Sequence, residues 1–393
     1  MKRSFSAVIL CLTLAFCLSA CKGKAQKAKV ETVEGVTLIH NPATPLHPTR
    51  AVVLEEEFAY KEKDETGEVR LFKPGRVAVD ARGNIYIGDN SDMAIKVFDQ
   101  TGKFLRAIGR QGEGPGEFTF IGDMVPLPDG RLLVTDFQAR RTSIFSPEGQ
   151  FLVSYPWKKN YLRVHLASES SCTLEEGVYT EETRERWIKK IDFAGEELIS
   201  FGKFSFPEIK MIRVGESGMV STSVPWTPAS VFAGDNSRQW LYHCPGDRYL
   251  IEVYDENGKL FRKIDRPYEA VPVTDEDISE LKSEMTERPD SPAAKLYAQM
   301  EFPKVKMITD RMIVDNDGNL WVRTSEVKKE AGKEITVYDI FNPDGFYEAR
   351  VWIDVIPSVF ADGKMYLTDE DETTGLSQVK RFRIIWKESS RIL

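Results

Sequence analysis

The feature that most constrains this chain is a set of turn and strand residues repeated at a fixed spacing. Four landmarks recur 47 residues further along the chain: Gly83 as Gly130, Asp89 as Asp136, Phe98 as Phe145 and Gly102 as Gly149. Between these landmarks apolar residues alternate with a period of two, and the runs break at Gly and Asp, which favours short strands over helices. A repeat of roughly 40–50 residues with four short strands per unit is typical of the blades of a β-propeller.

The same marks continue through the rest of the chain. The ending of the third strand at 97–103, for example, returns at 253–259. Six units can be traced in this way, near residues 75–118, 119–158, 160–204, 228–266, 307–354 and 357–390. The sequence therefore predicts an all-β fold, a six-bladed β-propeller.

Such a ring must be closed, because the first and last blades would otherwise expose unpaired sheet edges. Residues 50–58 precede the first unit and carry an apolar run followed by three glutamates and Phe58. We expect this segment to complete the last blade as its fourth strand. Residues 33–39 are expected to add a further edge strand.

One segment departs from the strand pattern. Residues 267–303 lie between blades four and five, and 273–285 is predicted to be a helix with Thr274 as its N-cap and three acidic residues in its first turn. A second short helix is expected over 292–300. This helical insertion is either a lid or docking arm at the channel mouth, or a surface insertion packed on the flank of a blade.

The best-preserved unit resembles a known family. Residues 74–80, 83–89, 95–99 and 109–118 together resemble one complete NHL repeat, and the whole chain is similar to the bacterial six-bladed β-propeller lipoproteins. This resemblance implies a ring with a central channel but no particular reaction, because one fold hosts many functions. The four glycines of 109–118 lack the Lys-Ser/Thr ending of a phosphate-binding loop, so they are interpreted as a link between blades.

The amino terminus is predicted to be a lipoprotein signal peptide, residues 1–20. It has a basic start, an apolar run and small residues before Cys21, which would be acylated. The alternative, a membrane-spanning anchor, is disfavoured because about 15 apolar residues are too few for a bilayer that needs roughly 20. Residues 21–32 are expected to form a lipidated, flexible tether, and 33–393 the propeller. Lys22 after the cysteine favours the periplasmic face of an outer membrane, with the cell surface as the other address.

The balance of acidic and basic residues restricts the kinds of molecule that the protein can bind. Without residues 1–20, 51 basic side chains face 61 acidic ones, which argues against nucleic acid as a partner. Two cysteines then remain besides Cys21. Cys172 and Cys244 either pair in an oxidising compartment or remain two buried thiols, and the second alternative is favoured because they are expected at opposite ends of their blades.

The repeated aspartates offer the first candidate site. Asp89 and Asp136 each end a second strand, so they are expected on one face of the ring, as is Asp369. They either cap the turns that follow or, with residues at the starts of innermost strands, surround the channel mouth. The candidate ligand-binding residues are Arg76, Asp89, Asn90, Asp123, Asp136, His243, Arg311 and Arg323.

Three kinds of function remain open. The first is a membrane-tethered binding or scaffold module that recognises a polar small molecule, a carbohydrate or a protein partner at the channel mouth. The second is a hydrolase or lyase that uses a metal such as Ca²⁺, which takes six to eight oxygen ligands, with Asp89, Asn90, Asp136 and His243 as candidate groups. The third is a structural envelope protein. The first is favoured, and whether the protein is an enzyme is left undecided.

Overall fold

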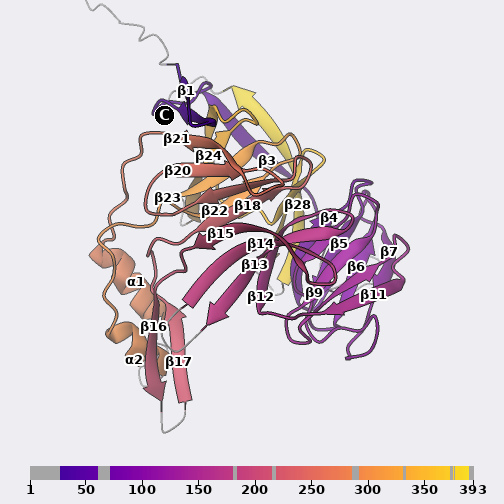
Figure 1. Cartoon of the computed structure of the whole chain (residues 1–393). Helices are drawn as coiled ribbons and strands as arrows, with labels where there is room; N and C mark the ends of the chain where they lie inside the picture. Colours follow the sequence, from indigo (N-terminus) through magenta and orange to yellow (C-terminus); the bar gives the residue numbers. More distant parts are fainter. Residues whose placement is uncertain are drawn as a thin grey trace, which may run out of the picture.

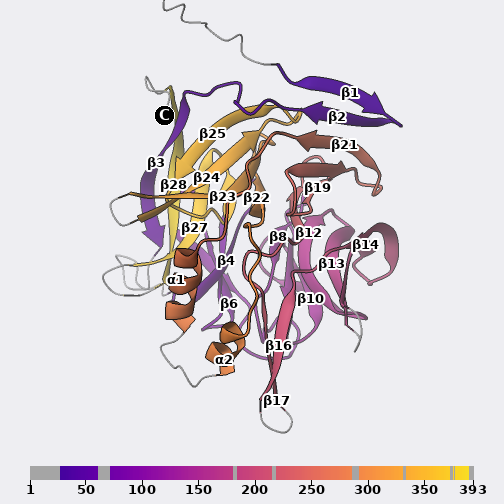
Figure 2. The same ribbon diagram turned by 90° about the vertical axis from the view of Figure 1, so that its left-hand side faces the viewer.

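The chain forms a ring of six blades, each built on four antiparallel strands, as predicted, and two further strands extend one of the blades (Figures 1 and 2). The computed structural model describes residues 27–60, 71–179, 184–214, 218–285, 292–330, 333–371, 375 and 377–388. The predicted signal peptide and Cys21 lie outside these residues. Within them, no helix is long and apolar enough to cross a bilayer.

The blades follow the predicted units closely. Blade 1 contains β4 (Pro74–Val79), β5 (Ile85–Asp89), β6 (Ala94–Phe98) and β7 (Phe104–Ile108). Blade 2 contains β8 (Met124–Pro126), β9 (Leu132–Asp136), β10 (Arg141–Phe145) and β11 (Phe151–Pro156). Blade 3 contains β12 (Tyr161–Ala167), β13 (Ser171–Tyr179), β14 (Arg184–Asp192) and β15 (Glu197–Phe204).

The second half of the chain builds the other three blades. Blade 4 contains β18 (Val231–Asp235), β19 (Trp240–Cys244), β20 (Leu250–Tyr254) and β21 (Leu260–Asp265). Blade 5 contains β22 (Thr309–Val314), β23 (Leu320–Glu330), β24 (Lys333–Phe341) and β25 (Tyr347–Ile353). Blade 6 contains β26 (Val359–Ala361), β27 (Lys364–Glu370), β28 (Ser377–Glu388) and, from the amino-terminal part, β3 (Arg50–Tyr60).

Ring closure is confirmed. Strand β3 pairs antiparallel with β28 along its length, from Tyr60 opposite Val379 to Arg50 opposite Glu388. Val52 and Leu54 of β3 pack against the core between blades 5 and 6, and Tyr60 is buried beside Phe98 of blade 1. The amino-terminal strand therefore joins the last blade to the first.

The further edge strand is present, but as part of a hairpin that extends a different blade. Strands β1 (Lys29–Val33) and β2 (Val36–His40) pair with each other, and β2 lies parallel to β21 in blade 4. Ile39 is buried against Ile264 in the core of blade 4. Strand β1 begins inside the segment expected to be a tether, so residues 29–32 belong to the sheet and not to a flexible tether.

Strand order fixes which loops share a face of the ring. The strands of each blade are antiparallel neighbours, so each innermost strand begins, and each second strand ends, on the face where consecutive blades are joined. We call this the insertion face. It carries both long connections of the ring, residues 205–230 and 266–308.

The turns on the opposite face follow from their Asp and Gly residues. In blade 4, Asp255 Oδ1 accepts the backbone N–H groups of Asn257 and Lys259, each at 2.9 Å. Gly258 follows with φ of +74°, a left-handed conformation that glycine adopts without strain. The recurring glycines Gly83, Gly102, Gly130 and Gly149 also have positive φ and form turns on this face.

The long connections form one projecting unit. Helix α1 (Asp275–Met285) is capped as predicted, because Thr274 Oγ1 accepts the N–H of Asp277 at 3.1 Å. Helix α2 (Pro292–Ala298) contacts α1 and also β16 (Ile209–Val214) and β17 (Gly218–Ser223), a hairpin that the sequence pattern did not predict. Both views show these four elements grouped together, away from the β1–β2 hairpin (Figures 1 and 2). The insertion therefore packs on a neighbouring connection.

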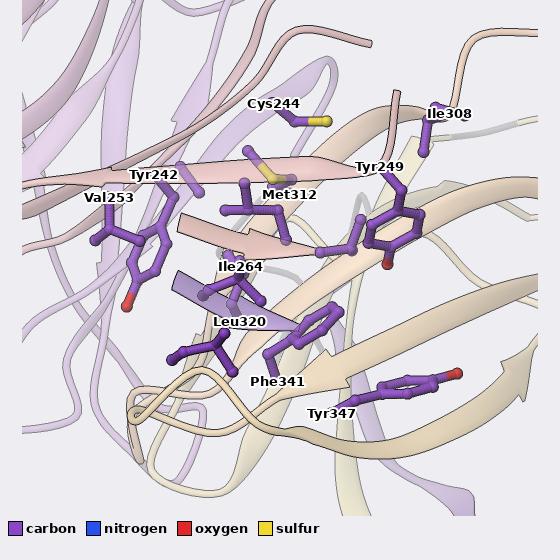
Figure 3. Packing of buried hydrophobic residues seen from close by; sticks show 14 residues of the cluster. Tyr242, Cys244, Tyr249, Val253, Ile264, Ile308, Met312, Leu320, Phe341 and Tyr347 are labelled. Carbon is purple, nitrogen blue, oxygen red and sulfur yellow. The ribbon is translucent and has the colours of Figure 1, made fainter. Parts of the chain in front are cut away.

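The core is distributed between the blades. The largest cluster joins blades 4 and 5 and contains Tyr249, Ile264, Met312 and Phe341 (Figure 3). Such flat inter-blade contacts suit large side chains, which contribute most of the buried apolar area. The two remaining cysteines, Cys172 and Cys244, are free and buried. Burial raises the pKa of the Cys172 thiol to about 12 and that of Cys244 to about 11.

Candidate functional site

The innermost strands bring charged side chains from several blades to the ring axis. Strand β4 contacts β8, β12 contacts β18, β18 contacts β22, and β26 contacts β4. These first strands therefore surround the axis. Their first residues lie at its insertion-face end, which is the channel mouth expected from the sequence.

Arg76 and Asp123 connect three blades at this end. Arg76 is the third residue of β4, and its Nη2 atom lies 3.5 Å from Asp123 Oδ1, just before β8. The other oxygen of Asp123 accepts the backbone N–H of Val164 in β12 at 2.8 Å. Asp123 is nearly buried, whereas the Arg76 side chain is half exposed. Asp123 is therefore held in place by its contacts, whereas the Arg76 guanidinium group is accessible to a ligand.

Arg311 and Arg323 lie directly opposite each other on β22 and β23 of blade 5. Asp310 holds Arg323 in a two-pronged ion pair, with Nε donating to Oδ1 at 2.7 Å. Arg311 has no carboxylate partner among the described residues and donates from Nη1 to the carbonyl of Pro357 at 3.1 Å. Burial lowers the pKa of Arg311, and the positive charges of Arg323 and Arg163 lower it further.

Arg163, in β12, is a site residue that the sequence analysis missed. Its side chain is exposed, and it forms no hydrogen bond or ion pair with any residue that the structure describes. Arg163 and Arg311 come from blades 3 and 5, which are separated by blade 4. Both residues lie near the insertion-face ends of innermost strands, and the positive charge of Arg163 lowers the pKa of Arg311. A signal was available in the sequence, since Arg76, Arg163 and Arg311 all lie near the starts of innermost strands.

Asp89, Asn90 and Asp136 serve the backbone. Asp89 is fully buried and accepts the N–H groups of Phe72 and Ser91 at 2.8 and 3.0 Å. Asp136 likewise accepts from Ala139 at 2.9 Å and from both the amide and the hydroxyl of Thr119, and Asn90 Oδ1 accepts the N–H of Ile121. These three residues join one blade to the next at the second strand. Their contacts match the turn-capping alternative.

His243 lies between blades 3 and 4 in a buried polar row. Its Nε2 atom is 3.0 Å from Ser230 Oγ, and its Nδ1 atom is 3.1 Å from Glu252 Oε2. The ring stacks on Phe232. Hydrogen bonds from His243 and Lys263 hold the pKa of Glu252 at about 2, so its carboxylate stays ionised. The order hydroxyl, imidazole, carboxylate is that of a nucleophile relay, which the sequence analysis did not identify.

The charged groups do not assemble a metal centre. Among the described residues, no three His, Cys, Asp or Glu side chains gather in a way that would hold a metal ion. Asp89 and Asp136, the groups suggested for Ca²⁺, are instead surrounded by the amide donors that saturate them. Asp369 differs from both, because it is half exposed and pairs with Lys380 at 2.9 Å.

Two hollows lie away from the axis. One, of about 600 Å³, lies between blades 5 and 6 and is lined by Glu56, Asp354, Ile356, Asp369 and Lys380, among others. The other, of about 410 Å³, lies near Glu113, Thr119 and Arg141. Arg141 donates to the carbonyl groups of Glu113 and Glu117 at 2.7 Å and so fixes the 109–118 link between blades 1 and 2.

Comparison with known proteins supports the fold. A family model described as a six-bladed β-propeller, DUF5128, matches residues 65–152, which span blade 1 and most of blade 2. No curated protein matches the sequence.

Solved structures are similar across the whole ring. A DUF4221 family member from Bacteroides vulgatus has a TM-score of 0.51 and 9% identity, over 86% of this chain and 99% of that chain. A Bacteroides fragilis protein described as exported has a TM-score of 0.47 and 10% identity, over 88% and 99%. Virginiamycin B lyase from Staphylococcus aureus has a TM-score of 0.41 and 11% identity, over 85% and 100%. Identities this low bear on architecture alone, and the chain is a six-bladed β-propeller with two short helices.

Proposed function

We propose that this protein is a membrane-tethered binding module that recognises a polar ligand at the channel mouth. The observation that carries the proposal is the convergence of Arg76, Asp123, Arg163 and Arg311 from four blades at one end of the axis. A surface that only mediated assembly would not need charged groups gathered on an axis. Rigid strands hold these groups in place, which lowers the entropic cost of binding.

The tether is proposed from the sequence. Residues 1–21 carry the pattern of a lipoprotein signal with Cys21 as its acylated residue. We therefore place the propeller in the cell envelope, on an outer membrane and facing the periplasm. Membrane fractionation of the wild-type protein and of Cys21→Ala tests this address, and a variant that stays in the membrane fraction would contradict it.

A ligand panel tests the binding module. The full chain would be heated with neutral and acidic oligosaccharides and with short peptides, and the unfolding midpoint followed by fluorescence. We expect at least one class to raise the midpoint in the wild type and to lose this effect in Asp123→Asn, while Asp317→Asn, an exposed turn residue on the opposite face, keeps it. A panel without any response, or equal responses in both variants, would contradict the proposal.

The relay at Ser230 favours a second candidate, a hydrolase that uses a serine nucleophile and no metal. His243 would accept the Ser230 proton as the hydroxyl attacks an acyl carbon, and ionised Glu252 would stabilise the resulting imidazolium. Labelling with a fluorophosphonate probe tests this candidate. Ser205 is the neighbouring serine, with its Oγ atom 3.0 Å from Ser230 Oγ. Labelling that is lost in Ser230→Ala and kept in Ser205→Ala would support this candidate, whereas an unlabelled wild-type protein would contradict it.

A further inference from the structure

Three arginines occupy equivalent positions on alternate blades. Arg76, Arg163 and Arg311 are each the third residue of the innermost strand in blades 1, 3 and 5. The residue after each arginine pairs with the second strand of its own blade: Val77 with Ile87, Val164 with Leu174 and Met312 with Val322. The three side chains therefore start at similar depths along the axis and at alternate points around it. We call them the axial arginines.

Four arginines lie near the channel mouth. The axial arginines and Arg323 bring four positive charges, and Asp123 and Asp310 supply two carboxylates against them. The whole chain, in contrast, has a formal net charge of −8. Glu175 also lies within electrostatic range of Arg163, but it is bonded to His165 at 2.9 Å and lies 3.6 Å from Arg186. These arginines therefore outnumber the carboxylates that pair with them.

The axial arginines are exposed to solvent. At Arg311, burial and the positive charges of Arg323 and Arg163 lower the pKa of the guanidinium group. An arginine with neither a carboxylate nor a hydrogen bond gains from a ligand that supplies both. A planar guanidinium group binds the oxygens of carboxylate, phosphate or sulfate with two parallel hydrogen bonds.

We infer that the ligand of the channel mouth carries an anionic oxygen group, which the axial arginines bind on the ring axis. This inference rests on the proposed binding function and names its ligand class. The Pro357 carbonyl accepts a hydrogen bond from Arg311, and Asp123 lies beside Arg76. Arg163 has no such contact among the described residues, so its guanidinium group is available to the anion. The anion relieves the repulsion between Arg163 and Arg311, and the rest of a polar ligand contacts the rim.

Calorimetric titration of the full chain tests this inference with four probes. A galacturonic acid trimer supplies carboxylates, inorganic phosphate and sulfate supply tetrahedral oxyanions, and a galactose trimer is the neutral control. We expect at least one anion to bind and the neutral trimer not to bind, with affinity that falls as salt is raised. The probe that binds shows whether the anionic group is a carboxylate, a phosphate or a sulfate.

Variants then locate the binding. Arg163→Gln should weaken anion binding about tenfold to a hundredfold, the range for a lost hydrogen bond to a charged group. Because Arg163 makes no hydrogen bond or ion pair with the residues that the structure describes, this variant should keep the wild-type unfolding midpoint. Arg82→Gln, an exposed arginine on the opposite face, should bind as the wild type does, and Arg163→Lys should recover part of the affinity because it restores the charge.

Two results would overturn the inference. Absence of binding by all three anions would do so, as would anion binding that is unchanged in Arg163→Gln. If the neutral trimer binds, its binding is lost in Asp123→Asn and no anion binds, the proposed binding function is supported but the anionic ligand class is contradicted. If no probe binds and no ligand of the wider panel raises the unfolding midpoint, both the binding function and the anionic ligand class are contradicted.

Discussion

Arg266 at the end of blade 4 donates from Nε to Asp339 Oδ2 in blade 5 at 3.0 Å, and both side chains are almost completely buried. Two tyrosines complete the cluster, because Tyr249 and Tyr347 donate to the same carboxylate at 2.8 and 2.6 Å. Arg266 also lies over both tyrosine rings. The boundary between blades 4 and 5 is therefore joined by a fully bonded ionic cluster.

Removing one partner of this pair should destabilise the ring strongly. Arg266→Met removes the cation bonded to the buried Asp339 carboxylate and leaves only Arg350, at 3.8 Å. Breaking a buried ion pair in this way typically costs about 3–5 kcal/mol of unfolding free energy. Urea unfolding measures the loss, and Arg82→Met, an exposed arginine, is the control. The double variant Arg266→Met with Asp339→Leu should regain part of the stability, because it leaves no buried charge. An unchanged midpoint in the single variant would show that the pair contributes nothing.

Strand β3 should be needed for cooperative folding. A chain that begins at residue 48 lacks the β1–β2 hairpin but keeps blade 6 complete, so we expect it to unfold cooperatively at a lower midpoint. A chain that begins at residue 61 also loses β3, which exposes the edge of β28 and opens the ring. We expect it to aggregate or to lose its cooperative transition. Equal melting curves for the two chains would refute closure by β3.

The Glu252 cluster should make stability depend on acid pH. The folded-state pKa of Glu252 is about 2, lowered from 4.5 by His243 and Lys263. Its contribution is therefore complete above pH 4.5 and is lost as the pH falls through 2, and it amounts to about 3 kcal/mol at most. Glu252→Gln should show a flatter loss of stability between these values. Exposed Glu256→Gln should follow the wild type, and a Glu252→Gln curve parallel to the wild-type curve would contradict the prediction.

Replacing Asp89 and replacing Asp369 should cost different amounts of unfolding free energy, although both residues follow the same sequence pattern. Asp89→Ala leaves the N–H groups of Phe72 and Ser91 without their buried acceptor, which should cost about 1–3 kcal/mol. Asp369→Ala removes only a half-exposed ion pair with Lys380 and should cost about 1 kcal/mol or less. Thermal unfolding compares the two. Neither variant should alter anion binding at the axis, and a loss of binding in Asp89→Ala would return this residue to the site.

The fold could be predicted from the sequence because its marks are local. Asp and Gly at each turn, alternating strands and the 47-residue spacing of blades 1 and 2 fix where strands begin and end. The capped helix α1 was recognisable from Thr274 and its acidic first turn for the same reason. The β16–β17 hairpin was missed because 205–230 has no repeated counterpart, and its packing depends on α2, more than 60 residues away.

The site was only partly predictable. Arg76, Asp123 and Arg311 were named from their place at strand starts, but Arg163 was overlooked because its segment matches the repeat weakly. Ser230 and Glu252 could not be connected with His243, since their contact depends on how β18, β19 and β20 lie side by side.

The sequence by itself determined the number of blades, the strand that closes the ring and the turns between strands, because each depends on residues close together in the chain. Only the tertiary structure decided which charges meet. Asp89 accepts several amide N–H groups, while Arg163 has no hydrogen-bond or ion-pair partner in the described part of the chain, and that difference arises from how blades pack around an axis. The burial of a side chain and the compensation of its charge depend on neighbours from distant segments of the chain, so no local sequence pattern predicts them.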